Sequence, residues 1–359
     1  MNVLVLFTPL EPYTFGTDQT FTYSGTEKTG KESYLATSRV LPEQTTLLGV
    51  LRFLSLGKKG ILKTDYSYKE NELAEICSAV GPESFSFQKT EQSFGCIHAI
   101  SPLFLFREEK RSVLVPNPFH NTAGDNGYCP MKLGSPVHCS EGCVALPLSE
   151  QYNAKKGHAG GFLELDSMDI HKDLFSFSTV TGNRKSFGRD RDKGFYRRET
   201  VSLKDGYSFA VLADIDKGSL PDTSVAYMGL KRSAFRVTAH PAEDIFGDSA
   251  SGDTPAEFLK NLVESRLDEG DVWYYALSDL RLSEEWKPAS FSIIEEKNIR
   301  NIETVYTEST EARRRKRSCS QYNLAVAGSV FSYSKPELLE NKNLQTIGYN
   351  ILCKLGRKS

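Results

Sequence analysis

The chain has 359 residues and a formal net charge of −2 at pH 7, with 39% hydrophobic and 25% charged residues. These are globular values, so the composition excludes a wholly disordered chain, and the length suits one large domain or two ordinary ones. The longest apolar runs, VLVLF (Val3 to Phe7) and LFLF (Leu103 to Phe106), are too short to span a membrane. We expect no membrane association.

Cysteine usage and the first residues indicate the compartment. Seven cysteines, an odd number in a long chain, argue against a disulfide framework. The first residues carry neither the basic leader nor the small-residue cleavage site of a secretory signal. We therefore expect a reduced, cytoplasmic protein.

The first predicted block, residues 1 to about 106, mixes strands and helices. NVLVLF at its start is strand-like. Pro42 suits a first helical position, and Gly49 in mid-helix indicates that another group approaches the backbone there. A second amphipathic helix is predicted at about 69–80. The first helix is predicted because four apolar residues recur at i, i+3, i+4 and i+7: Leu47, Val50, Leu51 and Leu54.

The start of this first helix is rich in small polar side chains. Gln44, Thr45 and Thr46 follow the proline directly. One interpretation is ordinary helix packing. The other is that these residues surround a positive helix end, where a phosphate backbone could bind.

The second block, residues 107 to about 194, is predicted to be a large irregular insertion, because Gly, Pro, Asn, Ser, Cys and His crowd the stretch 116–161. Cys129, His138, Cys139 and Cys143 lie close together there, with His120 nearby. Four such ligands could hold a structural zinc. The alternative is a set of scattered, reduced cysteines, because the spacing matches no standard zinc finger.

Two basic segments stand out from the nearly neutral chain. In RKSFGRDRDKGFYRR (Arg184 to Arg198), seven basic residues face two acidic ones, with Phe187, Phe195 and Tyr196 between them. Cations with interleaved aromatic rings are what single-stranded nucleic acid needs, although a solvated loop is the alternative. RRRKR (Arg313 to Arg317) has no aromatic residue, and we expect an exposed loop.

The third block, from Phe195 onward, is rich in predicted strands. RRETVSL and YSFAVLADI are joined through Lys204-Asp205-Gly206, and Asp-Gly predicts a hairpin. VAYMGLKRSAFRV predicts a strand pair or a bent strand. TPAEFLKNLVE predicts a helix with a capping box between Thr254 and Glu257. LAVAGSVFSYS predicts a strand broken by Gly328, and TIGYNIL predicts a closing strand. Together the blocks indicate an α+β protein.

The sequence lacks the common catalytic and nucleotide-binding motifs. None of the six histidines belongs to a triad, zincin or nucleophile-elbow pattern, and neither a Walker A nor a dinucleotide fingerprint occurs. We therefore expect a non-enzymatic protein that requires no cofactor, apart from the zinc considered above.

Short motifs in a fixed order point to a family. They are TPLEPYTFGTDQTF, LPEQTTLLGVLR, FYRRETVSLKDGYSF, YMGLKRSAF, AGSVF and IGYN. In this order, from Val3 to Asn350, the chain resembles the RAMP superfamily of CRISPR proteins. Within that superfamily it is most similar to the family of third subunits of the type III-B Cmr effector complex.

Individual positions carry the resemblance. The family's Pro-x-x-Thr-Thr, Leu-Gly and Arg pattern is matched by Pro42, Thr45, Thr46, Leu48, Gly49 and Arg52. Its C-terminal glycine-rich loop is matched by Ala327, Gly328, Ser329, Val330 and Phe331. Met228-Gly229-Leu230-Lys231 departs from the family's two glycines and glutamate, and Gly16-Thr17 departs from its arginine.

The resemblance implies a fold of two tandem ferredoxin-like (RRM-like) domains with a large irregular insertion. The N-terminal domain would cover 1–194, including the insertion at about 107–194, and the C-terminal domain 195–359. The resemblance also places the first helix where crRNA and neighbouring subunits meet. Glycine in the C-terminal loop would let backbone N–H groups approach a phosphate.

The resemblance further implies a non-catalytic subunit that binds the 5′ tag of crRNA and docks the large polymerase-like subunit. Backbone RAMP subunits would be further partners, and target RNA an indirect one. Predicted RNA contacts are Gln44, Thr45, Thr46, Arg184, Lys185, Arg191, Arg197, Arg198, Lys231, Arg232, Gly328 and Ser329.

Two alternatives stay open. One is a RAMP-type, metal-independent endoribonuclease that processes CRISPR RNA. Such relatives often use a histidine near the first helix, whereas the first histidine here is His98. The other is the equivalent capping subunit of another CRISPR effector type.

Overall fold

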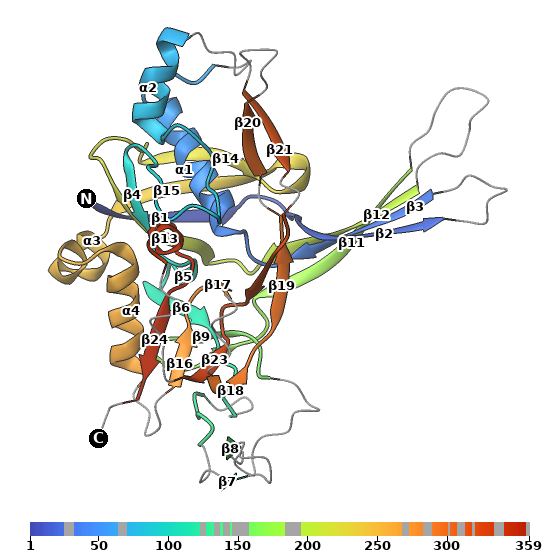
Figure 1. Ribbon diagram of the computed structural model, residues 1–359, viewed down its shortest axis with the longest axis vertical. Helices are drawn as coiled ribbons and strands as arrows, with labels where there is room; N and C mark the ends of the chain where they lie inside the picture. The colour runs from blue at the N-terminus through green and yellow to red at the C-terminus, as the bar shows by residue number, and fades with distance from the viewer. Residues whose placement is uncertain are drawn as a thin grey trace.

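The computed structural model shows a mixed α and β protein (Figure 1). It describes residues 1–24, 32–63, 70–122, 127–132, 137–138, 144–145, 158–183, 195–267, 273–282, 289–300, 302–306, 313–317, 320–333 and 341–356. The strands of this part of the chain form six sheets, most of whose pairs are antiparallel. The predicted mixture of helices and strands is confirmed. No helix within the described ranges is long and apolar enough to cross a membrane.

The largest sheet has nine strands and contains the first strand of the chain. Its order is β10-β9-β6-β5-β13-β1-β15-β14, with β4 paired to β13 outside this path. The strands are β1 (Asn2–Pro9), β4 (Ile97–Ile100), β5 (Phe104–Arg107), β6 (Ser112–Pro116), β9 (Phe162–Glu164), β10 (Ile170–His171), β13 (Tyr207–Ile215), β14 (Thr223–Met228) and β15 (Ser233–Pro241). Val3, Val5 and Phe7 belong to one core cluster, and Leu4 and Leu6 to another. A strand covered on both faces explains the unbroken apolar run NVLVLF.

The large sheet contains strands from both sides of the predicted domain boundary between residues 194 and 195. β13 and β15 both follow that boundary in sequence, yet each pairs with β1, which precedes it. β13 also pairs with β5, from Tyr207 opposite Arg107 to Ala210 opposite Phe104. The layer β15-β1-β13-β5 therefore needs residues from both predicted domains.

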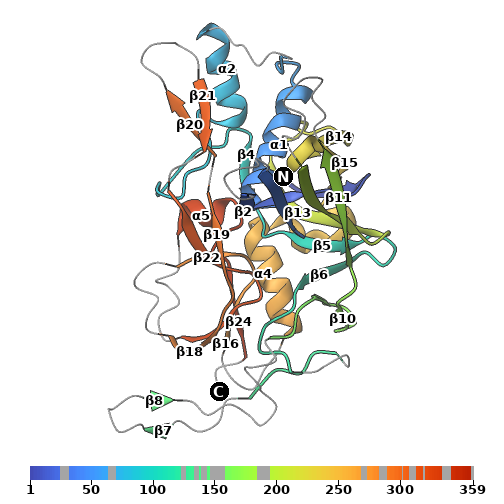
Figure 2. The same ribbon diagram turned by 90° about the vertical axis from the view of Figure 1, so that its right-hand side faces the viewer.

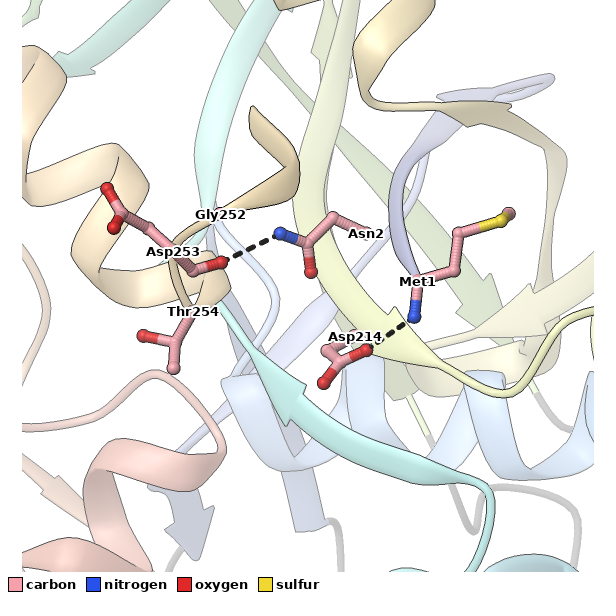
Figure 3. A pocket seen from close by; sticks show the side chains of 6 residues that line it. All are labelled: Met1, Asn2, Asp214, Gly252, Asp253 and Thr254. Carbon is pink, nitrogen blue, oxygen red and sulfur yellow. Dashed lines mark hydrogen bonds and ion pairs between the residues drawn. The ribbon is translucent and has the colours of Figure 1, made fainter. Parts of the chain in front are cut away.

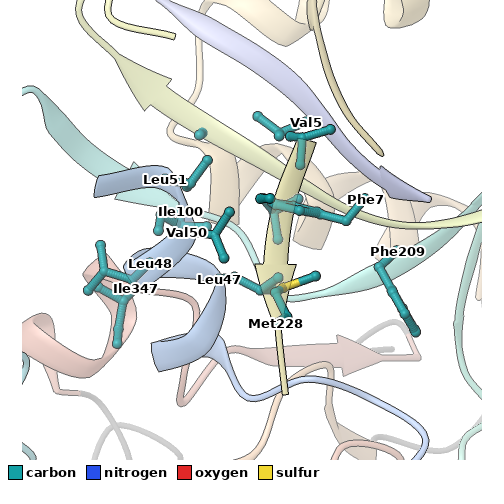
Figure 4. Close-up of a cluster of buried hydrophobic side chains, with 14 of the residues drawn as sticks. Val5, Phe7, Leu47, Leu48, Val50, Leu51, Ile100, Phe209, Met228 and Ile347 are labelled. Atoms are coloured by element: carbon teal, nitrogen blue, oxygen red, sulfur yellow. The ribbon is translucent and has the colours of Figure 1, made fainter. Parts of the chain in front are cut away.

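The structure describes five α-helices. They are α1 (Gln44–Lys58), α2 (Glu70–Val80), α3 (Glu243–Phe246), α4 (Pro255–Arg266) and α5 (Lys342–Thr346). α1 and α4 cover opposite faces of the large sheet, because α1 shares a core cluster with Val5 and Phe7 and α4 shares another with Leu4 and Leu6, whereas α2 packs on α1. α1 and α2 confirm the two predicted N-terminal helices. Leu47, Val50 and Leu51 of α1 pack in one cluster with Val5 and Phe7 (Figure 4).

Two details of α1 differ from prediction. Its N-cap is Glu43, so Pro42 precedes the helix instead of occupying its first position. Gly49 is exposed, and a Cβ atom added there would meet nothing within 4 Å. The predicted close approach to its backbone is therefore absent, because this face of the helix points away from the core.

A four-stranded sheet projects from the rest of the molecule, and we call it the arm (Figure 1). Its strands are β11 (Phe175–Asn183), β12 (Phe195–Leu203), β3 (Glu32–Arg39) and β2 (Phe15–Ser24), in that order across the sheet. The hairpin predicted through Lys204, Asp205 and Gly206 is wrong, since β12 and β13 belong to different sheets. Gly206 still turns with a positive φ of 83°, but the turn leads the chain from the arm into the large sheet.

The C-terminal strands form two further sheets. One has the order β18-β23-β16-β24, with β16 (Trp273–Ala276), β18 (Ala289–Ile293), β23 (Val330–Tyr333) and β24 (Leu352–Leu355). The other has the order β17-β22-β19, with β17 (Leu280–Arg281), β19 (Glu296–Ile299) and β22 (Tyr322–Ala325). Figure 2 shows α4 between these strands and β5 and β6 of the large sheet. The predicted capping box of α4 is confirmed, because the Thr254 side chain accepts from the Glu257 N–H and the Glu257 carboxylate accepts from the Thr254 N–H.

Other predictions for the C-terminal part of the chain are partly confirmed and partly wrong. VAYMGLKRSAFRV forms a strand pair, β14 and β15, and LAVAGSVFSYS is broken at Gly328 as expected. TIGYNIL is the end of α5, a turn and the start of β24 rather than one strand. RRRKR is strand β21 (Arg313–Arg317), paired with β20 (Ile302–Tyr306), and not a loop.

The predicted insertion contributes more regular structure than expected. β6, β9, β10 and β11 all come from residues 107–194. Between β6 and β9, the described residues include β7 (Val137–His138) and β8 (Val144–Ala145), which form a small ladder. Short strands of two to five residues carry too little periodicity to be recognised in the sequence.

Candidate nucleic-acid interface

The start of α1 is the first predicted RNA contact, and its Gln44 side chain is engaged within the protein. Gln44 is buried, and its side-chain amide donates to the Ser101 carbonyl at 2.8 Å. Thr45 and Thr46 are half-buried. The N-cap residue Glu43 already places a carboxylate at the positive end of the helix dipole. A phosphate at this end would meet that negative charge.

Glu43 is the centre of an ion-pair cluster that connects the N-terminal and C-terminal parts of the chain. Its carboxylate accepts hydrogen bonds from Arg39, from Lys297 at 2.9 and 3.0 Å, and from the Tyr349 hydroxyl at 3.3 Å. Lys297 also pairs with Asp279 at 2.5 Å. We call these five residues the Glu43 cluster. Their charges compensate one another, so the cluster joins elements rather than presenting charge to a ligand.

The electrostatics of the Glu43 cluster keep Glu43 and Lys297 ionised. Burial alone would raise the pKa of the Glu43 carboxyl, but Lys297 and Arg39 outweigh it and hold that pKa below its ordinary value of 4.5. Burial alone would lower the pKa of Lys297, but Asp279 and Glu43 hold it above its ordinary value of 10.5. Burial is also the main reason that the pKa of Tyr349 lies well above 10.0.

The loop of Gly328 and Ser329, the second predicted phosphate contact, is also buried. The Gly328 N–H donates to the Ala276 carbonyl at 2.9 Å, and its own carbonyl accepts from the Phe119 N–H at 2.8 Å. Gly328 has φ of 104°, and a Cβ atom there would overlap the Phe119 ring. The Ser329 hydroxyl donates to the Val326 carbonyl at 2.7 Å. Glycine is needed here for internal packing.

The arm carries the described part of the basic track. Arg184, Lys185 and Arg191 lie outside the described residues. Arg197 is exposed on β12, and Arg198 beside it is half-buried. Among the described residues, the buried Nε and Nη1 atoms of Arg198 have no hydrogen-bond partner. Because a guanidinium offers five N–H donors, an anion at this position would satisfy donors that the protein leaves unused.

The loop between β14 and β15 presents the remaining predicted cations. Lys231 and Arg232 are exposed, and both have left-handed φ values, 63° and 57°. Gly229 precedes them with φ of 74°, and a Cβ atom there would overlap the Thr14 carbonyl. That carbonyl accepts from the Leu230 N–H at 2.8 Å. Left-handed non-glycine residues cost about 1–2 kcal/mol each, and such strain clusters at functional sites.

Thr14 joins this loop to the arm. Its carbonyl holds Leu230, and its hydroxyl donates to the Glu199 carbonyl at 2.8 Å, one residue after Arg198. The Glu199 carboxylate accepts from the Ser38 N–H at 2.9 Å, so β12, β3 and the loop are fixed together. Two basic pairs that are separate in sequence thus lie near one junction. We call this surface the arm base: Arg197, Arg198, Lys231 and Arg232.

The predicted zinc site falls largely outside the described residues. Cys139 and Cys143 are not described, and only the backbone of His138 is. Cys129 is exposed and has a free thiol. Within the described ranges, no group of three or more His, Cys, Asp or Glu side chains could hold a metal ion. A structural zinc on Cys129, His138, Cys139 and Cys143 stays a prediction.

A shallow pocket at the start of β1 is unsuited to RNA (Figure 3). Its lining includes the carboxylates of Asp214 and Asp253. The terminal amine of Met1 already pairs with Asp214 at 2.7 Å, and the Asn2 amide donates to the Asp253 carbonyl at 2.9 Å. A phosphate there would be repelled by two acidic side chains.

A family model for CRISPR-associated proteins, Cas_Cmr3, matches residues 5–331. The chain belongs to this family. Membership in the Cas_Cmr3 family confirms the resemblance predicted from the motifs and makes the chain a subunit of a type III CRISPR effector complex. Comparison with curated proteins gives no match.

Solved structures provide distant likenesses to this Cas_Cmr3 chain. A chain of the type III-B Cmr-beta complex bound to cognate target RNA has a TM-score of 0.47 at 13% identity, covering 98% of this chain and 96% of that one. The same complex with target RNA and AMPPnP gives 0.45 at 13% identity, covering 99% of each chain. A chain of the Csm1–Csm4 cassette with AMPPNP gives 0.32 at 11% identity, covering 92% and 86%.

Some residues of this Cas_Cmr3 chain escaped the motif analysis. Glu43 and Lys297 are 254 positions apart, and no local pattern links them. Tyr227 is exposed on β14. Alternation in SVAYM could have revealed it, because Val225 and Tyr227 alternate with the buried Ala226 and Met228.

Proposed function

We propose that this Cas_Cmr3 protein is a non-catalytic subunit that holds the 5′ tag of crRNA at the arm base. The observation that carries the proposal is the strained loop that presents Lys231 and Arg232 next to the arm. Two adjacent cations held in an unfavourable backbone conformation suggest selection for their position. Arg197 and Arg198 supply further charge across the same junction.

Chemistry favours the RNA backbone as the ligand of the arm base. Arginine binds phosphate oxygens in a bidentate manner, and lysine binds them as a point charge. The buried donors of Arg198 are suited to a phosphate that enters between the arm and the loop. Such contacts position an RNA strand without reading its bases.

The same proposal includes the protein partners. The subunit would dock the large polymerase-like subunit and the backbone RAMP subunits, and would meet target RNA only through them. It also includes two ferredoxin-like units. The order β15-β1-β13-β5, with α1 after β1, supports one unit that draws strands from residues 2–241. The sheet of β18, β23, β16 and β24, packed on α4, supports a second.

The proposal is tested by binding of a fluorescent crRNA with an intact 5′ tag, compared with the same RNA carrying a scrambled tag. The variant Lys231→Glu/Arg232→Glu should bind the tagged RNA roughly tenfold or more weakly, since each lost phosphate contact removes counterion release. Lys110→Glu/Arg111→Glu is a matched control, because these adjacent basic residues are also exposed and lie in the β5–β6 turn. Equal affinity of both variants and wild type would contradict the proposal.

The proposal that the protein does not cleave RNA needs a separate measurement. Repeat RNA incubated with the purified protein in EDTA should stay intact over hours. Specific cleavage that a single His98→Ala substitution abolishes would instead establish a metal-independent nuclease. His98 is exposed and its ring contacts Asp216 at 2.9 Å, so this substitution spares the core.

A further inference from the structure

The β14–β15 end of the large sheet is covered on one face only. Ala226, Met228 and Phe235 point toward α1 and are buried in its cluster. On the opposite face, Val225 is 48% exposed and Tyr227 is 52% exposed. A strand that alternates in this way has an apolar side turned to solvent.

The apolar surface extends from β14 across the sheet. Tyr227 lies opposite Ala234 in the β14–β15 register, and Ala234 accepts a hydrogen bond from the Leu10 N–H at 3.0 Å. Residues directly opposite in an antiparallel pair share a face. Leu10, which is 54% exposed, therefore lies in the same row as Tyr227. We call Leu10, Val225 and Tyr227 the β14 patch.

The backbone of β14 is open along its outer side. Within the described residues, β14 pairs with β15 alone. Just before the strand, the Ala239 N–H donates to the Asp222 carbonyl at 2.9 Å. Because hydrogen-bonded and non-hydrogen-bonded pairs alternate in an antiparallel ladder, the N–H and C=O groups of Val225 and Tyr227 point outward. They form a row of donors and acceptors available to another strand.

The two ends of the same sheet differ in how their edges are protected. At one end, β10 has two residues, and short edge strands are a usual protection against pairing with other chains. At the other end, β14 has six residues, TSVAYM, with neither a charged residue nor a proline. An edge without these devices is expected to be covered by a partner.

The charge around the β14 patch indicates the chemical class of its partner. Lys231 and Arg232 follow the strand, and Arg236 is exposed opposite Val225. The Arg232 guanidinium lies 5.2 Å from the centroid of the Tyr227 ring. Against these three cations stands Glu11, whose carboxylate accepts from the Ala234 N–H. The surroundings are therefore net basic and complement an acidic partner.

We propose that β14 accepts an extended segment of another protein subunit of the effector complex as an added strand. The segment would carry apolar residues at alternate positions and acidic residues beside them. A protein is favoured over RNA because the outward backbone groups of β14 suit another strand, and Leu10 and Val225 are aliphatic. Tyr227 is the one aromatic ring of the patch, and the Arg232 guanidinium lies over it. Strand addition satisfies the outward backbone groups, and the patch receives the alternate side chains. This inference rests on the chain being a complex subunit. It shares Lys231 and Arg232 with the arm base, so its test measures protein binding without RNA.

Two variants test the added strand in the full-length protein. Tyr227→Glu places a negative charge in the patch and should repel the acidic segment. Val225→Pro removes an outward N–H that makes no bond to β15, the kind of edge position where proline is tolerated. Phe177→Glu on β11 is the matched control, because Phe177 is a strand residue of similar exposure, 56%. Melting temperatures confirm that all three proteins are folded.

The measurement is surface plasmon resonance against each purified protein subunit of the reconstituted complex, without RNA, together with tagged-crRNA affinity on the same preparations. Tyr227→Glu and Val225→Pro should weaken binding to one protein subunit by on the order of tenfold or more, whereas Phe177→Glu should not. In the wild-type protein, the Val225 and Tyr227 amides should gain hydrogen-exchange protection when that subunit binds.

Three outcomes would overturn the inference. The first is unchanged binding to every protein subunit with no added amide protection. The second is loss of crRNA affinity with unchanged protein binding, which would assign the patch to RNA. The third is a wild-type dimer in light scattering that Tyr227→Glu dissociates, which would assign the edge to a second copy of the chain. Failure of tag binding at the arm base would leave all these measurements interpretable.

Discussion

Two glycine turns that look alike in the sequence lie in opposite environments. The turn at Gly328 is buried, and its backbone groups bond to Ala276 and Phe119. The turn at Gly229 packs its glycine against Thr14 but presents Lys231 to solvent. Glycine in both turns signals a close approach. Only the exposure of the following residues shows whether the turn serves the core or a ligand.

The largest effect is expected on the buried side of this comparison. Gly328→Asp should lower the free energy of unfolding by about 4 kcal/mol or more, because it combines steric overlap with Phe119, a positive φ and a buried charge. Urea unfolding measures the loss. The crRNA affinity of the folded fraction should be unchanged. A stable variant that has lost RNA binding would show that this turn contacts RNA after all.

The Glu43 cluster is a second buried feature. Glu43→Gln should lower the free energy of unfolding by about 2–4 kcal/mol, because it leaves the positive charges of Arg39 and Lys297 without enough negative charge beside them. Chemical unfolding at pH 7 measures this cost. Glu91→Gln is the control, because the Glu91–Lys342 pair is highly exposed and should contribute little. Equal effects of the two substitutions would contradict the structural importance of the cluster.

The same cluster predicts how stability depends on pH. The Glu43 pKa is lower in the folded protein, so its contribution is present above 4.5 and is lost as pH falls through the lower, folded value. The Lys297 pKa is higher in the folded protein, so its contribution is present below 10.5 and is lost as pH rises through the higher, folded value. When the free energy of unfolding is measured from pH 2 to 7, the Glu43→Gln variant should lose less stability at low pH than the wild type. An identical acid profile in the variant would refute this assignment.

In the exposed turn, Gly229→Ala should lower the free energy of unfolding by a smaller amount, about 1–3 kcal/mol, and should clearly weaken crRNA binding. A Cβ atom would overlap the Thr14 carbonyl, so the loop must shift and carry Lys231 and Arg232 with it. Thermal unfolding and tagged-crRNA affinity on one preparation measure both effects. A destabilised protein with wild-type affinity would make the two glycine turns equivalent.

The smallest effect is expected from Lys231→Gln, which should leave the melting temperature unchanged because the side chain is exposed. In a plot of log affinity for tagged crRNA against log salt, the slope should become shallower by about 1. Lys110→Gln provides the reference slope, since Lys110 is an exposed lysine outside the arm base. Identical slopes for the two variants would remove Lys231 from the phosphate contacts.

Local signals in the sequence predicted local structure well. The helices α1 and α2 follow from apolar spacing, and the capping box of Thr254 and Glu257 from residue preferences at four successive positions. The Asp205-Gly206 turn was also located correctly. Its strands were mispaired, because a turn residue specifies only the reversal and the partners of β12 lie elsewhere in the chain.

The candidate site was less predictable, for a physical reason. Gln44 and Gly328 have residue types suited to phosphate, but burial depends on packing against Ser101 and Phe119, which lie far away in sequence. Lys231 and Arg232 remain candidates because a tight hairpin turn is exposed by its own geometry. Long-range contacts thus decide which polar groups stay available to a ligand, and short motifs do not encode them.

The position of β1 at the centre of the large sheet has a consequence for biosynthesis. Val3 pairs with Ala213 on one side and Pro241 on the other, so the first strand emerges from the ribosome long before its neighbours. At elongation rates of about 5–20 residues per second, the wait is on the order of 10 to 50 seconds. During that time VLVLF has no sheet to enter, and pairing over such sequence distances is intrinsically slow. We therefore expect VLVLF to stay unpaired during synthesis, and a fragment that ends before residue 241 to be prone to aggregation.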